Sequence, residues 1–210
     1  MSPSGEVFLE TERLVLRRFT PEDVDNLVAL DADPGVMRYI TGGAPTPREE
    51  VENDVLPAFL AYYEHGAWGF WAVEERDTGA YIGWFHLRPP RDGHTEDPEL
   101  GYRIRVSAWG KGYATEGTIA LVDKAFRDLD AKRVFAETMV VNEASRRVME
   151  KAGLKHVRTF RADWPVRIDG DEHGDIEYAI TREEWEAHLR DGRGTSGARP
   201  DTQARPPRHP

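Results

Sequence analysis

A glycine-rich segment with one lysine, Gly110-Lys111-Gly112-Tyr113-Ala114, stands directly before a helical pattern. A helix begins with about four backbone N–H groups that have no intrahelical partner, at the positive end of the helix dipole. Phosphates bind at such helix starts, and glycine lets the backbone approach a bulky diphosphate closely. The segment therefore predicts a phosphate site to which Lys111 adds a positive charge. A tight strand-to-helix turn without a ligand explains the same residues equally well.

Two other phosphate-binding loops fit this segment less well. The Walker A pattern G-x-x-x-x-G-K-[ST] is absent from the chain. A dinucleotide-binding fingerprint requires a third glycine where this chain has Thr115, and it follows an apolar buried strand. The strand pattern here instead carries Arg103 and Arg105 in alternation with apolar residues.

The elements that must position this segment alternate between strand and helix patterns. Period-2 alternation predicts strands over residues 13–19, 68–72, 81–87, 100–106, 134–141, 154–160 and 176–180. Helical spacing predicts helices after residue 20, over 46–63, 112–129 and 143–152, and after residue 181. Short turns make the middle strands antiparallel neighbours, and a strand–helix–strand–helix unit follows them. The sequence therefore predicts an α/β (α+β) fold with one mixed sheet and helices packed on it.

Local signals set several helix boundaries. Thr20 followed by Pro21 and acidic residues is typical of a helix start, and Thr46 with Glu49 predicts a second start with a capping box. Pro57 is expected to interrupt the helix that contains it. Gly153 is expected at the position just after the end of the helix over 143–152.

Four stretches of the chain resemble one family. Ile104-x-x-x-x-Trp109-Gly110-Lys111-Gly112-Tyr113-Ala114 resembles the acetyl-CoA loop of the GNAT N-acetyltransferases. Trp109, in place of the usual Gln or Arg, is similar to the RimJ/RimL-like branch, the ribosomal-protein acetyltransferases and their relatives. Residues 11–27, 141–160 and 178–189 resemble other segments of that branch in the same order. The branch often has proline after the strand of the loop, where this chain has Val106.

The resemblance implies where acetyl-CoA would bind. In this family a mixed, mostly antiparallel sheet with helices on both faces splays open at the acetyl-CoA site. The pantetheine arm would lie along the strand that ends at Ile104–Val106, and Asn142 would hydrogen-bond that arm. An asparagine that simply heads a helix explains Asn142 as well. The resemblance assigns the CoA pyrophosphate to the backbone N–H groups of Trp109, Gly110, Lys111, Gly112, Tyr113, Ala114 and Thr115.

The resemblance also implies catalytic roles. An alkylammonium ion has a pKa of about 10, so a base must take a proton from the amine, and Glu99 is the candidate. The leaving thiolate has a pKa near 8.5, and Ser145 is the candidate acid that protonates it. A backbone N–H near Ile104 would meet the carbonyl oxygen. Glu99 as an isolated surface residue and Ser145 as an ordinary first-turn residue are the open alternatives.

Aromatic and basic side chains are candidates for the pocket of the amine acceptor, although most aromatic residues lie in protein cores. The candidates are Arg38, Tyr39, Trp68, Trp84 and Tyr178. The acceptor predicted from this reading is a protein N-terminus or a small-molecule amine. A non-catalytic acyl-CoA-binding sensor of the same fold is the alternative function.

Composition excludes several classes of protein. The chain of 210 residues has no cysteine, which excludes disulfides, zinc–thiolate sites and a thiol nucleophile. Its net charge of −10 makes it a poor nucleic-acid binder and favours cationic ligands, while acidity that only aids solubility is the open alternative. The sequence has no apolar run of about 18 residues and no signal-peptide pattern, so we expect a cytoplasmic protein that does not bind membranes. Asp169-x-Asp171-x-His173 departs from a calcium loop, and no metal is expected.

The chain is expected to form one domain. The resemblance covers about residues 8–189, so residues 1–189 are predicted to be the acetyltransferase domain. Residues 190–210 are rich in Gly, Pro and Arg and almost lack apolar residues, so they are predicted to be a disordered tail. Homodimers are frequent in the family, which makes a homodimer an expectation here.

Overall fold

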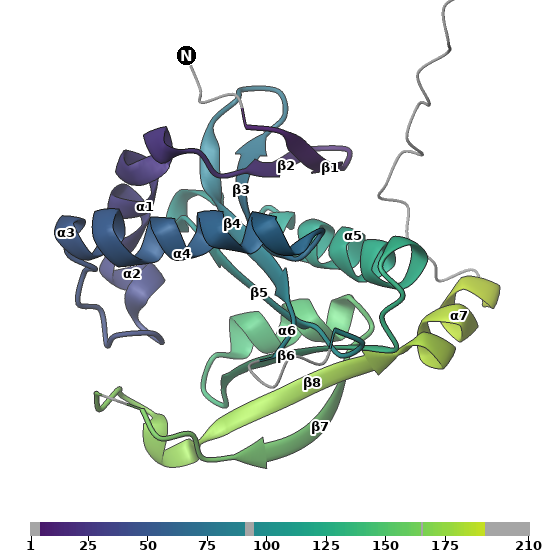
Figure 1. The fold of residues 1–210 in the computed structure, drawn as a ribbon. Helices are drawn as coiled ribbons and strands as arrows, with labels where there is room; N and C mark the ends of the chain where they lie inside the picture. Colours follow the sequence, from purple (N-terminus) through teal and green to yellow (C-terminus); the bar gives the residue numbers. More distant parts are fainter. Residues whose placement is uncertain (1–4, 91–94, 165, 192–210) are drawn as a thin grey trace, which may run out of the picture.

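The computed structural model describes residues 5–90, 95–164 and 166–191. They form an 8-stranded sheet in the order β1-β2-β3-β4-β5-β6-β8-β7 (Figure 1). All neighbouring strands run antiparallel except β5 and β6, which are parallel. The strands are β1 (Val7–Glu10), β2 (Leu14–Arg18), β3 (Gly69–Glu75), β4 (Tyr81–Arg88), β5 (Glu99–Ile104), β6 (Arg133–Met139), β7 (Lys155–Phe160) and β8 (Asp175–Thr181).

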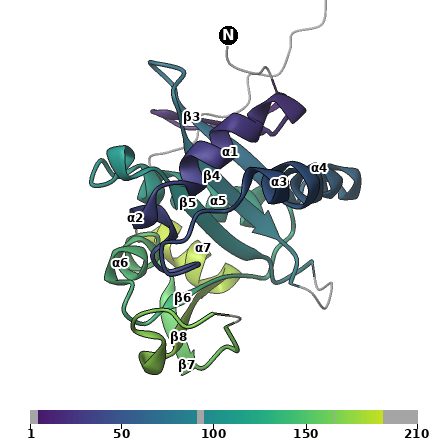
Figure 2. The same ribbon diagram turned by 90° about the vertical axis from the view of Figure 1, so that its left-hand side faces the viewer.

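Helices lie on both faces of the sheet, as Figure 2 shows. One face carries α1 (Val24–Asp31), α2 (Pro34–Met37), α3 (Arg48–Glu50) and α4 (Leu56–Ala61). The other face carries α5 (Tyr113–Asp128), α6 (Glu143–Lys151) and α7 (Arg182–Arg190). We call these the α1–α4 face and the α5–α6 face. The observed mixed sheet with two helical layers confirms the predicted fold class.

The parallel strands β5 and β6 are paired over a much shorter length than β4 and β5 are. Strands β5 and β6 have a single register pair, Glu99 with Phe135, whereas β4 and β5 are paired along the whole of β5. The two strands separate beyond that pair, as the resemblance implied. The separation leaves an opening between β5 and β6 that α5 and α6 flank on one face.

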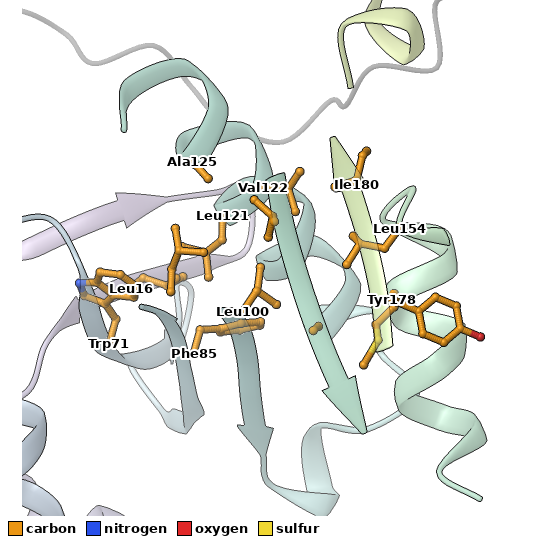
Figure 3. Packing of buried hydrophobic residues seen from close by; sticks show 14 of the residues in the cluster. Leu16, Trp71, Phe85, Leu100, Leu121, Val122, Ala125, Leu154, Tyr178 and Ile180 are labelled. Atoms are coloured by element: carbon orange, nitrogen blue, oxygen red, sulfur yellow. The ribbon is translucent and has the colours of Figure 1, made fainter. Parts of the chain in front are cut away.

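Each face has its own core. The α5–α6 face buries residues from both halves of the sheet, including Leu16, Phe85, Leu121 and Ile180, in one continuous cluster (Figure 3). The α1–α4 face buries a second cluster in which the rings of Phe59 and Phe70 stack with centroids 3.9 Å apart. These two cores hold β4 and β5 rigidly from both sides.

The structure differs from the predicted elements at three places and confirms one predicted interruption. Strand β1 was not predicted. Thr46 does not cap α3, because its hydroxyl donates to Asp31 Oδ2 at 2.7 Å and Pro47 occupies the cap position. The predicted interruption of the helix containing Pro57 is confirmed, because a π-helical turn, Val51–Val55, accommodates the missing proline N–H. Strand β5 ends at Ile104, so Val106 lies in a 3-10 turn, Val106–Ala108.

Other boundary predictions are confirmed. Thr20 starts a 3-10 turn with a capping box, and Gly153 follows α6 with a φ of +88°.

No helix among the described residues is long and apolar enough to cross a membrane. Within the described ranges no group of three or more His, Cys, Asp or Glu residues could hold a metal ion. The predicted tail lies outside the described residues from position 192 onward.

Candidate active site

The start of α5 presents unpartnered backbone donors. Gly110 and Gly112 have φ angles of +73° and +83°, a region that favours glycine, and they turn the chain into the helix. Among the described residues no acceptor is recorded for the amides from Gly110 to Thr115, and the first helical bond is from Glu116 N to Gly112 O. These donors stand at the positive end of a helix of 16 residues. The arrangement fits a diphosphate.

Trp109 differs from the other predicted members of this loop. Its backbone N–H already donates to Val106 O at 3.0 Å, so that amide is not an open donor. Its indole Nε1 donates to Ile104 O at 2.7 Å, although about half of the residue is exposed. The side chain therefore fastens the loop to the end of β5.

Three residues that the sequence analysis missed, Arg13, Glu116 and Thr11, also fasten the loop. The guanidinium of Arg13 donates to Lys111 O at 2.9 Å and pairs with Glu116 at 2.6 Å. Glu116 Oε1 accepts from the Thr11 hydroxyl at 2.6 Å. Burial raises the pKa of Glu116, but the hydrogen bonds from Thr11 and Arg13 together lower it below its ordinary value. The contacts join residues about 100 positions apart, so no local pattern revealed them.

The edge of β5 faces the opening in the sheet. Arg105 N donates to Ile82 O of β4 at 2.8 Å. Because antiparallel bonding alternates along a strand, the backbone groups of Tyr102 and Ile104 point away from β4, toward β6. The carbonyl of Ile104 is used by Trp109, while Val106 lies beyond the strand and is partly exposed. An extended ligand can therefore pair with the amides of Tyr102 and Ile104.

Glu99 lies where the opening narrows. It forms the register pair with Phe135 and its side chain points to the α1–α4 face. Arg88 Nη2 donates to Glu99 Oε2 at 2.8 Å, and His86 Nε2 lies 3.6 Å from Oε1. The carboxylate is thus held by neighbours yet remains 24% exposed, so an amine can reach it.

Ser145 lies on the opposite face of the same opening. Its hydroxyl is 3.1 Å from the hydroxyl of Tyr102. Burial raises the pKa of Tyr102 to about 12, so this phenol stays protonated at neutral pH. Glu99 and Tyr102 are three residues apart, which is about 10 Å along a strand. Glu99 and Ser145 therefore approach the opening from its two sides and do not touch each other.

Asn142 has a structural task in this arrangement. Its Oδ1 accepts from Ser145 N at 3.2 Å, which caps α6, and its Nδ2 donates to Thr138 at 3.1 Å. Asn142 therefore caps the start of α6, as the alternative interpretation of this residue expected. Within the described part of the chain no partner is recorded for the second hydrogen of Nδ2, so a ligand can accept from it.

The structure does not bring the predicted acceptor residues together. Trp84 is buried in the core of the α1–α4 face, and Trp68 packs against the other core. Arg38 and Tyr39 follow α2, with the Arg38 guanidinium 5.1 Å from the Tyr39 ring. Tyr178 points to the α5–α6 face and donates to Glu150 of α6 at 2.8 Å (Figure 3). Strand alternation separates Tyr178 from Trp84, because their side chains lie on opposite faces.

The comparisons with known proteins agree with this geometry. A family model described as "Acetyltransferase (GNAT) domain" matches residues 13–155. The chain belongs to the GNAT acetyltransferase family. This GNAT chain is 34% identical over 194 residues to the FsC-acetyl coenzyme A-N(2)-transacetylase of Aspergillus fumigatus, covering 88% of this chain and 80% of the relative.

Solved GNAT structures share the fold. RimL, the ribosomal L7/L12 alpha-N-protein acetyltransferase, in complex with coenzyme A, superimposes with a TM-score of 0.70 at 18% identity. That comparison covers 84% of this chain and 98% of RimL. Spermidine N-acetyltransferase from Vibrio cholerae, in complex with CoA and spermine, gives a TM-score of 0.67 at 18% identity, with 81% and 96% coverage.

This GNAT chain is an N-acetyltransferase, and its family uses acetyl-CoA as the acyl donor. The residues present fit that donor. The open amides from Gly110 to Thr115 suit its diphosphate, and the free edge of β5 suits an extended arm.

Proposed function

We propose that this acetyltransferase transfers an acetyl group from acetyl-CoA to a primary amine by direct attack of the amine on the thioester. The observation that carries the proposal is the set of unpartnered amides at the start of α5, beside the opening between β5 and β6. The loop amides hold the diphosphate, Lys111 adds charge, and the amides of Tyr102 and Ile104 orient the arm. The acetyl group then lies near the narrow end of the opening.

Glu99 acts as the base in this proposal. The amine arrives protonated, and Glu99 takes the proton on the α1–α4 face, directly or through water. Arg88 Nη2 orients the carboxylate by donating to Oε2 at 2.8 Å. The neutral nitrogen attacks the carbonyl carbon, and a strand amide at Tyr102 or Ile104 donates to the carbonyl oxygen as it becomes negative.

Ser145 acts as the acid on the other face. When the tetrahedral intermediate collapses, the C–S bond breaks, the sulfur takes a proton from the Ser145 hydroxyl, and the nitrogen releases its second proton to water. Tyr102, 3.1 Å away, stabilises the resulting Ser145 alkoxide by a hydrogen bond until a proton from water restores the hydroxyl. The products are an N-acetylated amine and coenzyme A, and no covalent enzyme intermediate forms.

The acceptor class rests on the relatives and on charge. By their names, these proteins are an N(2)-transacetylase, a ribosomal alpha-N-protein acetyltransferase and a spermidine N-acetyltransferase, which supports a nitrogen acceptor. The net charge of −10 favours a cationic acceptor.

We further propose that residues 1–189 form the catalytic domain. A cytoplasmic location, a homodimer, and Arg38 and Tyr39 as acceptor contacts remain predictions.

The test combines binding with turnover. Coenzyme A should raise the melting temperature, and a thiol-release assay with a peptide N-terminus and spermidine should show turnover. Glu99→Gln should lower kcat/KM by about 10²–10³-fold while the thermal shift with coenzyme A persists. Glu172→Gln, an exposed carboxylate 62% accessible, is the matched control and should leave both readouts unchanged.

Three results would contradict the proposal. Coenzyme A at millimolar concentration that gives no thermal shift removes the binding site. A shift without turnover on any amine favours the non-catalytic sensor. A Glu99→Gln variant with wild-type kcat/KM from pH 6 to pH 9 removes Glu99 from the mechanism.

A further inference from the structure

His86 is a buried imidazole, and among the described residues neither of its two ring nitrogens has a hydrogen-bond partner. Only 7% of the residue is exposed. A buried polar group without a partner costs free energy, and native proteins rarely keep one without a reason. Packing alone would be served better by an apolar ring at this position.

The position of the ring is determined by a glycine on the neighbouring strand. His86 pairs with Gly101 of β5. A Cβ atom at position 101 would lie 2.5 Å from His86 Cε1 and 2.8 Å from Nε2. The imidazole therefore lies directly over the backbone of β5, in space that any other residue at 101 would fill. Phe70 and Trp84 border the ring, with centroids 5.1 Å and 5.9 Å away.

This position aims the ring at Glu99. Glu99 precedes Gly101 by two residues, so the Glu99 side chain lies on the face of β5 that the His86 ring covers. The distance from His86 Nε2 to Glu99 Oε1 is 3.6 Å, while Arg88 holds the other oxygen, Oε2, at 2.8 Å. The gap at Oε1 is too short for an intervening water and only slightly longer than a hydrogen bond.

We propose that His86 is a positioning residue for Glu99: its neutral imidazole, held over Gly101, presents Nε2–H to Oε1 and orients the carboxylate toward the amine. The inference rests on the proposed base role of Glu99. Catalytic hydrogen bonds are often long in a ligand-free site and tighten when substrate binds, which brings 3.6 Å into range.

The charged groups around His86 are consistent with a neutral ring. Glu99 and Arg103 face it from β5, and Arg88 faces it from β4, while β3 contributes the Phe70 ring. Burial lowers the pKa of His86 more than Glu99 raises it, and Arg88 and Arg103 lower it further. A neutral imidazole has one N–H, and the adjacent carboxylate favours placing it on Nε2.

Two variants of His86 separate positioning from packing. His86→Phe keeps an aromatic ring but has no donor, whereas His86→Gln keeps an N–H donor but has no ring. If His86 positions Glu99, His86→Phe lowers kcat/KM about tenfold at pH 7. It also moves the acid limb of the pH profile upward by about one unit, because the carboxylate loses a stabilising donor. His86→Gln should stay within about threefold of wild type with an unmoved acid limb.

A packing role gives the opposite order. His86→Phe would then match wild type in rate and pH profile, and His86→Gln would be the worse variant, which overturns the inference. An equal loss in both variants with an unmoved acid limb overturns it too. A thermal shift with coenzyme A confirms folding of each variant, and His86→Leu takes the place of His86→Phe if the latter does not fold.

A double variant keeps this inference distinguishable from the proposed function. If His86 acts through Glu99, adding His86→Phe to Glu99→Gln lowers kcat/KM no further. Additive losses show that His86 acts independently of Glu99 and overturn the inference. Wild-type kcat/KM in the Glu99→Gln single variant contradicts the proposed base role of Glu99 independently of the results for the His86 variants.

Discussion

Two hydroxyl groups face each other on the α5–α6 face of the sheet, beside its opening, from Tyr102 on β5 and Ser145 on α6. Their oxygens are 3.1 Å apart, and the pKa of Tyr102 is raised to about 12 by burial. Either group is therefore protonated at neutral pH and able to donate to a leaving sulfur. The proposed mechanism assigns the proton transfer to sulfur to Ser145 and gives Tyr102 a supporting hydrogen bond. Loss of the Tyr102 hydroxyl should therefore cost less activity than loss of the Ser145 hydroxyl.

Single variants decide between these hydroxyls. Ser145→Ala should lower kcat by about 10²-fold or more, whereas Tyr102→Phe should lower it by about tenfold or less. Steady-state kinetics with thermal unfolding as the folding control makes the measurement. The reverse ranking would assign the acid role to Tyr102, and unchanged kcat in both variants would remove the acid step from the mechanism.

At the scale of elements, the site depends on how closely α5 approaches the sheet. Gly117 faces Phe85 of β4, and a Cβ atom at position 117 would lie 2.4 Å from Phe85 Cζ. Phe85 is fully buried. The glycine thus brings the start of α5, with its open amides, next to the edge of β5.

Gly117→Ala tests this packing. Alanine gains about 1 kcal/mol of helix propensity, but overpacking costs about 1–3 kcal/mol. The steric cost wins, and the melting temperature should fall by about 2–6 °C with a weaker shift from coenzyme A. Adding Phe85→Leu opens the space, so the double variant should be more stable than the sum of the single effects. A more stable Gly117→Ala would show that α5 adjusts freely.

At the scale of the whole molecule, an excess of carboxylates decides how stability depends on pH. Glu137 of β6 has its pKa raised by burial and by the nearby Glu99 and Glu177. A carboxyl whose folded-state pKa is raised favours folding below the unfolded value of about 4.3 and loses that contribution as pH increases. Charged Glu137 therefore destabilises the protein at neutral pH.

Glu137→Gln should raise the melting temperature by about 1–2 °C at pH 7.5 and have no effect at pH 4 or below. The effect is small because the side chain is 36% exposed. Glu184→Gln is the control of opposite sign, since the hydrogen bond from Lys155 lowers the pKa of Glu184. Its variant should lose stability at pH 7.5 and approach wild type as pH falls through 4. Thermal unfolding from pH 4 to pH 8 makes the comparison.

Local chemistry made much of the fold predictable from the sequence. Apolar alternation located seven of the strands, and residue spacing located the long helices α5, α6 and α7. The loop from Gly110 to Ala114 was found because glycine before a helix has a direct conformational reason. Thr46 was misassigned since a capping pattern does not reveal the competing acceptor, Asp31, which approaches through tertiary contact.

The sequence by itself determined the glycine-rich loop and the strand and helix pattern, because both depend on near neighbours in the chain. Its resemblance to the family supplied the candidates Glu99 and Ser145. Only the tertiary structure decided which groups meet. It placed Arg13 on the loop, Tyr102 against Ser145 and His86 beside Glu99, and it separated Tyr178 from Trp84. The physical reason is that these contacts depend on strand register and on which face each side chain occupies, and residues far apart in the chain fix both.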